Sequence, residues 1–588
     1  MRAQTKVIVA AAAVLLLGVQ TVLANELMDA VKRGDSAKVQ VLLQKGNAGV
    51  NARDVDGSTA LHWAVYDDKL DLARTLIGAG ADVKAVTREG VTPMSLASLN
   101  GDAKMIDLLL AAGADPNRPL AHGETPLMMA ARTGNVDAIK TLLAHGADVN
   151  AKEKLRGTTA LMWAAANSNA GAIRALVAGG ANVAMRSAVI TRGRAPYLAP
   201  TARARIQEAQ RGTGQAGTSI KVDLTGKKKG SNPSAKVFQD DQSRTLSDED
   251  KAAASAKKKA AKFSFFRKPA PKDWGGLTAL VFAARQGDMA SVEALVDAGA
   301  DVNQVTEFGW TPLLTATQNR YYDIGKYLLD HGADPNIANK GGWNPLYIAT
   351  DNRNIEGGDY PVRKARGMSH LDFIKLLLKA GADPNLRMAS STETRTVFTN
   401  QWLYEHGATP FLRAAQSGDL TLMTLLLKYG ADPSIPTYDN VTPLMVACGI
   451  GWVQGVTYEW SPEESLKVVK LLLSLGADVN AHDSVDHRTA LMGAAHKGRT
   501  AEIQLLVDHG ANMNAHDIGS RDSIHRLAGV TWRAIDYADG LVRVGVQSAN
   551  PHPDAAALLR KLMKEKGLQV PPPGRTLASI CVTPSVCQ

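Results

Sequence analysis

Histidine and aspartate side chains gather near the end of the chain, and these residue types could bind a metal ion. The set is His482, Asp483, His487, His509, His516 and Asp517. Zinc ligands must converge to about 2 Å from the ion, whereas equivalent residues of neighbouring packed helical units lie about 8–10 Å apart. The tetrapeptide Asn-Ala-His-Asp occurs twice, at 480–483 and 514–517, one such unit apart. We therefore interpret these residues as surface residues and predict no metal site and no cofactor.

The motifs of common catalytic sites are missing from the sequence. It contains no nucleophile elbow, no P-loop, no dinucleotide-binding fingerprint and no His-Glu-x-x-His zinc motif. We therefore predict no catalytic residues and expect a protein that is not an enzyme.

The three cysteines offer a different chemistry. Cys448 lies in an apolar stretch, so we expect it to be a small buried side chain. Cys581 and Cys587 lie in the last eight residues and could form a disulfide if the protein is exported. The alternative is a pair of free thiols, and the haem-attachment pattern Cys-x-x-Cys-His is absent.

The first residues have the pattern of a secretory signal peptide. Arg2 and Lys6 precede a short apolar run from Val7 to Val19, and Ala24 is a small residue before a cleavage point. The run is short for a membrane-spanning helix, which needs about 20 residues. We predict a signal peptide at 1–24 and a periplasmic or secreted protein, with an uncleaved N-terminal membrane anchor as the alternative.

The elements that must position these side chains repeat along the chain. A phrase of the type Thr-Pro-Leu-x-x-Ala recurs, and a Gly-Ala-Asp phrase follows each Thr after about 21 residues. Thr suits a helix N-cap, Pro suits the first helical position, and Gly ends a helix in the left-handed conformation. The spacing predicts two short helices and a turn per unit, with the Thr step of 33 residues seen at Thr59, Thr92, Thr125 and again at Thr278, Thr311.

This pattern resembles the ankyrin repeat family, whose unit has 33 residues and a Thr-Pro-Leu-His-x-Ala motif. The resemblance covers eleven repeats from about 25 to 529 and a degenerate twelfth, although only His62 retains the motif's His. It implies an all-α solenoid of helix pairs and β-turn fingers. The family's function is protein binding in a concave groove, so the resemblance implies a non-catalytic interaction scaffold.

Aromatic residues at finger positions are concentrated in the second half of the array. Corresponding positions in the first half hold small or polar residues such as Val55, Ser58 and Glu89. Exposed Trp and Tyr are common interface anchors, although packing between adjacent fingers is the alternative. We predict that an unknown protein partner contacts Trp274, Phe308, Trp310, Trp343, Tyr404 and Tyr438.

One segment separates two groups of repeats and accounts for the whole net positive charge of the chain. Residues 187–272 hold 19 Lys and Arg against 7 Asp and Glu, while the whole chain has a formal net charge of +10. With few core-forming residues, the segment is predicted to be disordered. It could bind anionic surfaces such as an envelope, a membrane or a polyanion, or it could be a linker. No nucleic-acid role is expected for the protein as a whole.

We therefore predict five segments and one main function. The main function is an exported scaffold that binds a protein partner. The alternatives are an anionic-surface binder acting through the basic insertion and an enzyme whose site lies in the inserted loops. The segments are a signal peptide at 1–24, ankyrin repeats 1–5 at 25–186, a basic low-complexity insertion at 187–275, repeats 6–11 with loop insertions at 276–529, and a degenerate capping repeat and tail at 530–588.

Overall fold

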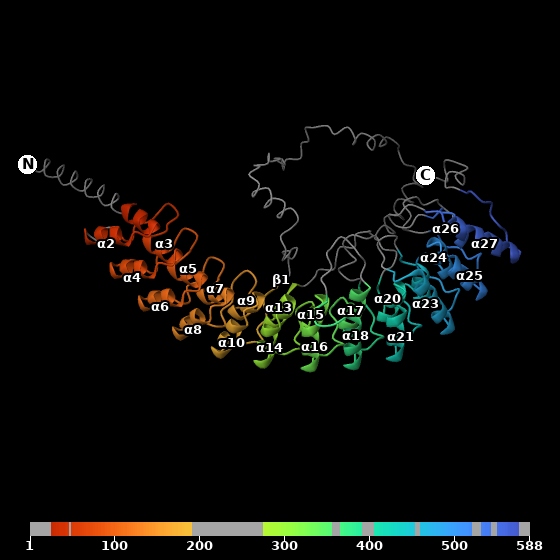
Figure 1. Cartoon of the computed structure of the whole chain (residues 1–588), viewed down its shortest axis with the longest axis horizontal. Coiled ribbons are helices and arrows are strands. Elements are labelled where there is room, and N and C mark those ends of the chain that lie inside the picture. Colours follow the sequence, from red (N-terminus) through yellow and green to blue (C-terminus); the bar gives the residue numbers. More distant parts are fainter. Residues whose placement is uncertain are drawn as a thin grey trace, which may run out of the picture. The chain divides into compact units, whose positions relative to one another are not determined.

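The computed structural model describes residues 25–45, 49–190, 274–354, 365–390, 405–452, 459–519, 531–542 and 550–575. Within these ranges the protein is helical except for two strands of two residues each. Twelve helix pairs follow one another along this part of the chain, and each pair is one repeat (Figure 1). The predicted all-α repeat fold is confirmed.

We number the repeats 1 to 12, call the two helices of each repeat inner and outer, and call the segment that enters an inner helix its finger. The inner helices are residues 25–33, α3 (Ala60–Tyr66), α5 (Pro93–Asn100), α7 (Pro126–Thr133), α9 (Ala160–Ala166), α13 (Ala279–Gln286), α15 (Pro312–Gln318), α17 (Pro345–Arg353), α20 (Pro410–Gln416), α22 (Pro443–Cys448), α24 (Ala490–His496) and α26 (Ala534–Ala538). The outer helices are α2 (Ser36–Gln44), α4 (Leu70–Gly78), α6 (Ala103–Ala111), α8 (Val136–Ala144), α10 (Ala170–Ala178), α14 (Met289–Asp297), α16 (Tyr322–Asp330), α18 (His370–Lys379), α21 (Leu420–Lys428), α23 (Pro462–Ser474), α25 (Thr500–Asp508) and α27 (Pro553–Glu565).

The inner helices begin as the sequence predicts. In repeat 3 the Thr92 hydroxyl accepts a hydrogen bond from the Ser95 N–H, and Pro93 occupies the first helical position. Gly101 ends the same helix with φ of 73°. A free N–H group at the helix start is therefore satisfied by the cap, and the left-handed end suits a residue without Cβ.

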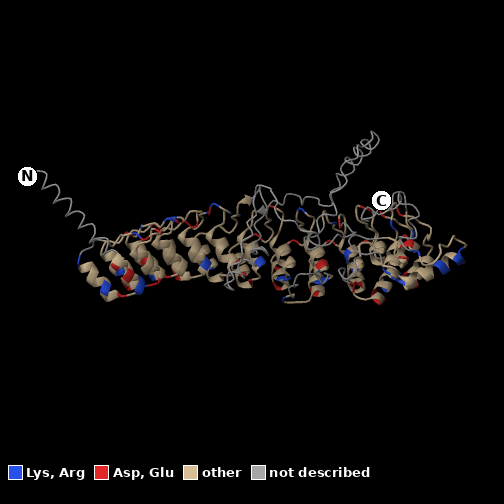
Figure 2. Ribbon diagram, turned by 90° about the horizontal axis from the view of Figure 1, so that it is seen from above, with Lys and Arg blue, Asp and Glu red and all other residues tan. Residues whose placement is uncertain are grey.

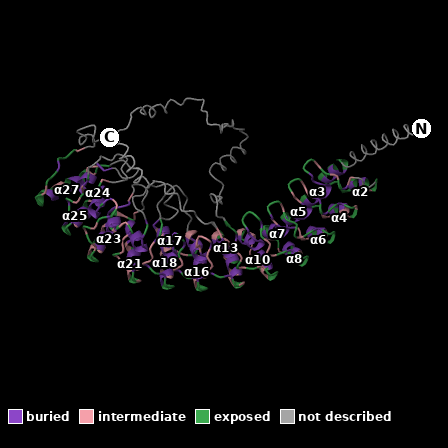
Figure 3. Ribbon diagram, turned by 180° about the vertical axis from the view of Figure 1, so that it is seen from behind, coloured by how far each residue is buried: buried purple, intermediate pink, exposed green. Residues whose placement is uncertain are grey.

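The outer helices bury one face against the inner helices and leave the other in solvent. In α6, the side chains of Met105, Ile106 and Leu109 are fully buried. The buried residues form a continuous layer between the inner and outer helices, while exposed residues lie at the fingers and the outer ends (Figure 3). A helix pair has too little apolar surface to fold alone, so each repeat is stabilised by its neighbours.

Consecutive repeats stack through both helical layers. Each inner helix contacts the next inner helix, as α3 contacts α5 and α5 contacts α7, and outer helices such as α4 and α6 pack in the same way. The buried residues of repeats 1 to 12 belong to a single apolar cluster.

Asparagine side chains connect neighbouring repeats at the ends of the outer helices. Asn117 Nδ2 donates to the Gly146 carbonyl at 2.9 Å, and its Oδ1 accepts from the Asp148 N–H at 2.7 Å. One side chain thus satisfies two groups of the next repeat that would otherwise need water. We call this series the asparagine ladder; its members are Asn51, Asn117, Asn150, Asn303, Asn336, Asn385 and Asn480.

The stack of helices continues past the basic segment. Helix α9 contacts α13, and α10 contacts α14. The Ser187 N–H donates to the Leu277 carbonyl at 2.9 Å, so the finger of repeat 6 combines residues from both ends of the segment. The described repeats before Ala188 and after Gly275 form one compact unit. In the second unit, Val189–Trp274, the described residues belong to the paired strands β1 (Val189–Ile190) and β2 (Trp274–Gly275).

The surface of the repeats is mixed in charge. Figure 2 shows Lys and Arg interspersed with Asp and Glu along the described helices and fingers. Among the described residues, none of the helices has the length and apolar character needed to cross a membrane. The predicted signal peptide at 1–24 lies outside the described residues.

Candidate partner-binding surface

Two positions of the inner helix α3 are not buried. They are the fourth and the seventh residues after the capping residue, which are Trp63 and Tyr66 in α3. Trp63 is half-buried and Tyr66 is 60% exposed. Because the repeat length is nearly constant, the same two positions recur at the same place on neighbouring inner helices.

In repeats 2 to 6 the fourth position is always apolar, while the seventh is Tyr66, Leu99 or Ala166 in three repeats and Arg132 or Arg285 in the other two. The large apolar side chains at these positions form a row that we call the inner-helix stripe. Leu99 is 47% exposed, and Met129, which lies between Leu96 and Trp163 in the row, is buried. The helices involved contact one another in sequence, so the side chains lie on adjacent elements. The stripe consists of Trp63, Tyr66, Leu96, Leu99, Trp163 and Phe282.

The two indoles of the stripe are held by their own fingers. Trp63 Nε1 donates to the Ser58 hydroxyl at 3.1 Å, and Trp163 Nε1 donates to the Thr158 hydroxyl at 2.9 Å. The Trp63 ring also packs edge-on against Tyr66, with 6.0 Å between the ring centroids. These contacts fix the ring positions, so little side-chain freedom remains to be lost when another molecule binds.

In repeats 8 to 11 the same positions are buried. The fourth-position Arg413 of α20 is 0% exposed. At the seventh position, Asp351, Gln416 and His496 are also buried. Among the described residues, the fourth and seventh positions are therefore mainly apolar in repeats 2 to 6, apart from Arg132 and Arg285, and they are buried in repeats 8 to 11.

Arg413 is the centre of a buried polar network. Its guanidinium group donates to Asp351 at 2.8 Å, to the Ser417 hydroxyl at 2.8 Å and to the Asn354 carbonyl at 2.5 Å. Asn354 in turn accepts from Trp460 Nε1 at 2.9 Å, 106 residues later in the chain. The network supplies hydrogen-bond acceptors for the buried guanidinium group, as a buried charge requires. It also connects repeats 8, 9 and 10.

The structure brings three of the predicted finger aromatics together. Trp343 packs edge-on against Trp310, with 5.6 Å between ring centroids, and against Phe308 at 6.3 Å. Trp343 is only 3% exposed, and its Nε1 donates to the Ser390 carbonyl at 3.0 Å. Trp343 is therefore a packing residue between fingers, which differs from its predicted place at the centre of a partner surface. Phe308 and Trp310 are half-buried beside it.

Tyr438 is separate from that cluster and remains accessible. It is 56% exposed, the Arg387 guanidinium lies over its ring at 4.0 Å from the centroid, and the His406 ring is 4.6 Å away. Arg387 also donates to the Gly407 carbonyl at 3.0 Å and the Pro436 carbonyl at 2.6 Å. This arrangement orients the tyrosine on the surface of its finger.

The side chains of the other predicted residues lie outside the described part of the structure. Trp274 lies in β2, but its side chain is outside the described part, as are Tyr404, Cys581 and Cys587. The buried Cys448 is described as a free thiol, and burial raises its pKa. A buried thiol with a raised pKa is unreactive, which agrees with a packing role.

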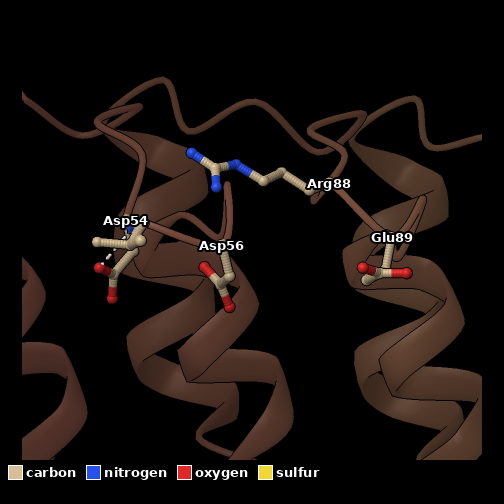
Figure 4. Close-up of a pocket in the computed structure, with 5 residues that line it drawn as sticks. Asp54, Asp56, Arg88 and Glu89 are labelled. Atoms are coloured by element: carbon tan, nitrogen blue, oxygen red, sulfur yellow. Dashed lines mark hydrogen bonds between the residues drawn. The ribbon is translucent and has the colours of Figure 1, made fainter. Parts of the chain in front are cut away.

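The fingers of repeats 2 and 3 border a shallow depression of about 460 Å³, lined by Asp54, Val55, Asp56, Arg88 and Glu89. Figure 4 shows Arg88 reaching from its own finger toward the finger with the two aspartates. The Arg88 N–H donates to the Asp56 carbonyl at 2.9 Å, and Lys32 donates to the Asp54 carboxylate at 2.6 Å. The Lys32 ammonium and the Ser58 hydroxyl lower the pKa values of Asp54 and Asp56, respectively. The depression is a polar margin beside the stripe.

The histidines and aspartates with metal-ligand character are distributed over two repeats. His509 is exposed and its Nδ1 bonds to the Leu505 carbonyl, while His516 contacts the Thr531 hydroxyl at 2.9 Å. Asp483 is buried with Arg488, and Asp517 accepts from Tyr537 at 2.7 Å. Within the described residues, no three such side chains converge on one point.

The stripe was not predicted, because the prediction of the partner surface rested on the aromatic residues of the fingers. The available signal was Trp63 and Trp163, which occupy the same position after Thr59 and Thr159. A large aromatic residue at a repeated, outward-facing helix position is unusual for a solvated surface. Alignment of the fourth position across repeats would have revealed the apolar row in the first half.

Comparison with known proteins supports the repeat assignment. A family profile described as "Ankyrin repeats (3 copies)" matches residues 27–120, 117–187, 252–339, 280–388 and 460–535. A second profile, "Ankyrin repeat", matches residues 406–438. Together these matches cover more than half of the chain.

Individual relatives are similar over short stretches only. The chain is 47% identical over 53 residues to human "Protein phosphatase 1 regulatory subunit 27", which is 9% of this chain and 34% of that protein. It is 38% identical over 65 residues to zebrafish (Danio rerio) "Notch-regulated ankyrin repeat-containing protein A", 10% of this chain and 58% of that one. It is 38% identical over 69 residues to mouse "2-5A-dependent ribonuclease", 12% of this chain and 9% of that protein. The matches thus span less than two thirds of each relative.

Proposed function

Since this chain belongs to the ankyrin repeat family, whose repeats form protein-interaction domains, we propose that it is a non-catalytic scaffold that binds a protein partner through the inner-helix stripe. The stripe is the observation on which this proposal depends. Tyr66 and Leu99 are exposed apolar side chains on adjacent inner helices, and Trp63 and Trp163 are held in place beside them. Such a row on a protein surface indicates an interaction site.

The proposal moves the partner site from the second half of the array to the first. Large, fixed aromatic side chains are typical binding hot spots, because they bury much area at little entropic cost. Phe308, Trp310 and Tyr438 remain candidates for secondary contacts, since each is at least partly exposed. The buried polar positions of repeats 8 to 11 offer no comparable apolar surface in the described residues.

Site-specific photocrosslinking in the cells that produce the protein tests this assignment. A photoreactive residue at Tyr66 or Leu99 should crosslink to the same partner. The matched control is Val41, which is 51% exposed but lies on the outer helix α2. Equal crosslinking from Val41, or no product from Tyr66 and Leu99, would contradict the proposed surface.

A double substitution tests the energetic contribution of the stripe. Tyr66→Ala with Leu99→Ala should weaken capture of the crosslinked partner by roughly 30-fold or more, since a hot spot contributes about 2 kcal/mol or more. Both side chains are exposed, so the melting temperature should change little. A lower melting temperature with unchanged capture would show that the residues serve only folding.

We further propose that the protein is exported after cleavage before Asn25. The motivation is the sequence alone, in which Arg2 and Lys6 precede a short apolar run and Ala24. N-terminal sequencing of the mature protein should begin at Asn25. A soluble protein that retains Met1 would contradict export, and a membrane-bound one would support the anchor alternative.

The basic segment supports a second candidate function, which is binding to anionic surfaces. Its 19 Lys and Arg against 7 Asp and Glu in residues 187–272 favour contact with polyanions. Because Ile190 and Trp274 lie in paired strands, a short linker can replace residues 191–273 without separating the repeats. If this variant retains partner capture but no longer sediments with anionic vesicles, the segment has its own binding role. If vesicle binding is unchanged, this candidate is rejected.

A further inference from the structure

The finger between α23 and α24 brings two histidines together in one hairpin. An isolated antiparallel bridge pairs His482 with Thr489, and the Asp483 N–H donates to the Arg488 carbonyl at 3.1 Å. His487 lies in the turn that these contacts close. The two imidazole rings are 4.7 Å apart between centroids, and both residues are exposed.

The buried carboxylate of Asp483 stabilises the hairpin by hydrogen bonds. Asp483 accepts hydrogen bonds from the backbone N–H groups of Val485 at 2.9 Å and Asp486 at 2.6 Å. It also accepts from the Arg488 backbone at 3.1 Å and from Arg488 Nε at 3.0 Å. Since Asp483 is fully buried, these bonds fix the turn, and the two rings are held close before any ligand arrives.

The ring nitrogens are available for coordination. His482 Nδ1 lies 3.1 Å from the Asp483 carbonyl oxygen, which can only accept, so this contact favours the tautomer with the proton on Nδ1 and the lone pair on Nε2. A backbone carbonyl that orients the other ring nitrogen is the usual support for a metal-ligating histidine. No hydrogen bond from the His487 ring to a described residue is present.

The position of His487 is unusual for this fold. The equivalent residue is a glycine in fingers such as those of Gly57, Gly90, Gly123 and Gly309, and it is Asn440 in the preceding finger, each with positive φ. His487 adopts φ of 57° in their place. A side chain in this conformation is less favourable than glycine, so the chain accepts some strain to place an imidazole beside His482.

We propose that His482 and His487 bind one divalent transition-metal ion, with solvent completing its coordination. Imidazole pairs favour copper, nickel and zinc over calcium or magnesium, and Cu²⁺ should bind most tightly. The two ligands belong to one finger, so the distance between repeats, which argues against sharing an ion across fingers, does not apply. The remaining positions of the ion stay open to water or to a donor from another molecule.

Calorimetric titration of the metal-free full-length protein with CuCl₂ and ZnCl₂ tests the proposal. The main variant is His487→Gly, which restores the residue found in other fingers and should preserve or raise the melting temperature. It should lose one Cu²⁺ site, or bind there at least tenfold more weakly. His482→Ala should show the same loss, while His509→Ala, at an exposed histidine at the end of α25, should bind as the wild type does.

Electron paramagnetic resonance of the Cu²⁺ complex provides a second readout that does not depend on stability. The wild type should show two nitrogen ligands at this site, and each single variant should show one fewer. Unchanged copper stoichiometry and affinity in His487→Gly would overturn the proposal. Loss of the site in His509→Ala would also overturn it, because the ion would then lie in another place.

Discussion

His496 and Glu502 show how burial controls the charge of individual side chains in this protein. Burial in α24, with His552 and nearby cations, lowers the pKa of His496 to about 4. Burial raises the pKa of Glu502, although Lys497 opposes that shift. In both side chains burial disfavours the charged form, so stability depends on pH in opposite directions at the two residues.

The first residue-scale prediction concerns acid. Because the folded pKa of His496 lies below the usual 6.5, the unfolded chain binds the proton first as pH falls. Stability present above about pH 6.5 is therefore lost progressively toward pH 4, and at pH 5 one such histidine costs about 2 kcal/mol. His496→Gln should lose that much less stability between pH 7 and pH 5, as measured by urea unfolding. His509→Gln is the control, and equal pH dependence in all three proteins would contradict the assignment.

Glu502 should behave in the opposite way. The raised pKa means that the unfolded chain releases its proton first as pH rises, so the folded state is penalised from about pH 4.5 upward. Glu502→Gln keeps an acceptor for the Ser465 hydroxyl, which bonds to Oε1 at 2.9 Å, and removes the charge. The variant should melt at a higher temperature than the wild type at pH 7, with a smaller difference at pH 4.5.

A lower melting temperature of Glu502→Gln at pH 7 would show that the charge stabilises the fold. The control is Glu565→Gln on α27, which makes the same change at the surface.

The Trp343 side chain should affect stability but not binding. It is buried between two fingers, and truncation of a buried Trp costs roughly 3–5 kcal/mol. Trp343→Ala should therefore lower the melting temperature clearly, while crosslinking from Tyr66 to the partner persists at temperatures where the variant is folded. Tyr438→Ala, at an exposed aromatic, should leave the melting temperature nearly unchanged. Lost crosslinking in a folded Trp343→Ala protein would place the partner at these fingers after all.

The aromatic residues also show where sequence reasoning reaches its limit. The sequence places Phe308, Trp310 and Trp343 on fingers, which is where the structure has them. Whether such a ring faces solvent depends on the neighbouring finger, and Ser390 in that finger accepts the Trp343 N–H. Periodicity gives the position of a residue within its repeat, but it does not give the contacts made by an irregular loop of the next repeat.

At the scale of elements, the asparagine ladder explains why the Asp-x-Asn phrase recurs. Each ladder Asn satisfies the end of the next outer helix, as Asn303 does for Gly332 at 3.0 Å and Asp334 at 2.8 Å. The ladder is interrupted where the residue is Lys84, Ala184 or Ser434. The connections between repeats are therefore unequal along the described stack.

Two matched variants test the asparagine ladder: one adds a missing asparagine and the other removes an existing one. Lys84 has the same local turn as Asn117, since its N–H bonds to Asp82 Oδ1 at 2.9 Å and the Asn117 N–H bonds to Asp115 Oδ1 at 2.8 Å. Lys84→Asn should stabilise the protein by about 1 kcal/mol through a new bridge to Gly113 and Asp115 at the end of α6, and Asn117→Ala should destabilise it by about 1–3 kcal/mol. Chemical unfolding and amide exchange at the affected repeats measure both effects. Destabilisation by Lys84→Asn would show that the bridge requires more than the turn geometry.

The helices could be predicted from the sequence, but the long-range contacts between their side chains could not. Thr caps, Pro at the first helical position and Gly at helix ends specify each helix locally, so repeats such as the one beginning at Thr92 were predictable. The burial of Arg413 was not, because the partners of its guanidinium lie 59 and 62 residues earlier in the chain, at Asn354 and Asp351. Long-range polar contacts of this kind have no periodic signal.

At the scale of the whole molecule, the basic segment interrupts the sequence without interrupting the stack. The inner helices α9 and α13 contact each other like any neighbouring pair, and so do α10 and α14. Ala175 and Leu176 before the segment share one apolar cluster with Leu280 and Leu295 after it. In a repeat protein, stability is approximately the sum of the repeats and their nearest-neighbour interfaces, so this interface should stabilise both halves.

Cleavage within the segment should therefore leave a single particle. A site for a specific protease, inserted after Gly230, allows the chain to be cut at one point, and the two fragments should separate on a denaturing gel but elute together at the size of the uncut protein. The Gln304 side chain, which donates to the Ala184 carbonyl at 3.0 Å, contributes to the same junction. A matched variant, Leu280→Asp, places a charge in the buried α13 face and should make the cut fragments separate or unfold. Fragments of the unsubstituted protein that elute independently would mean that the repeats on the two sides of the segment are separate domains.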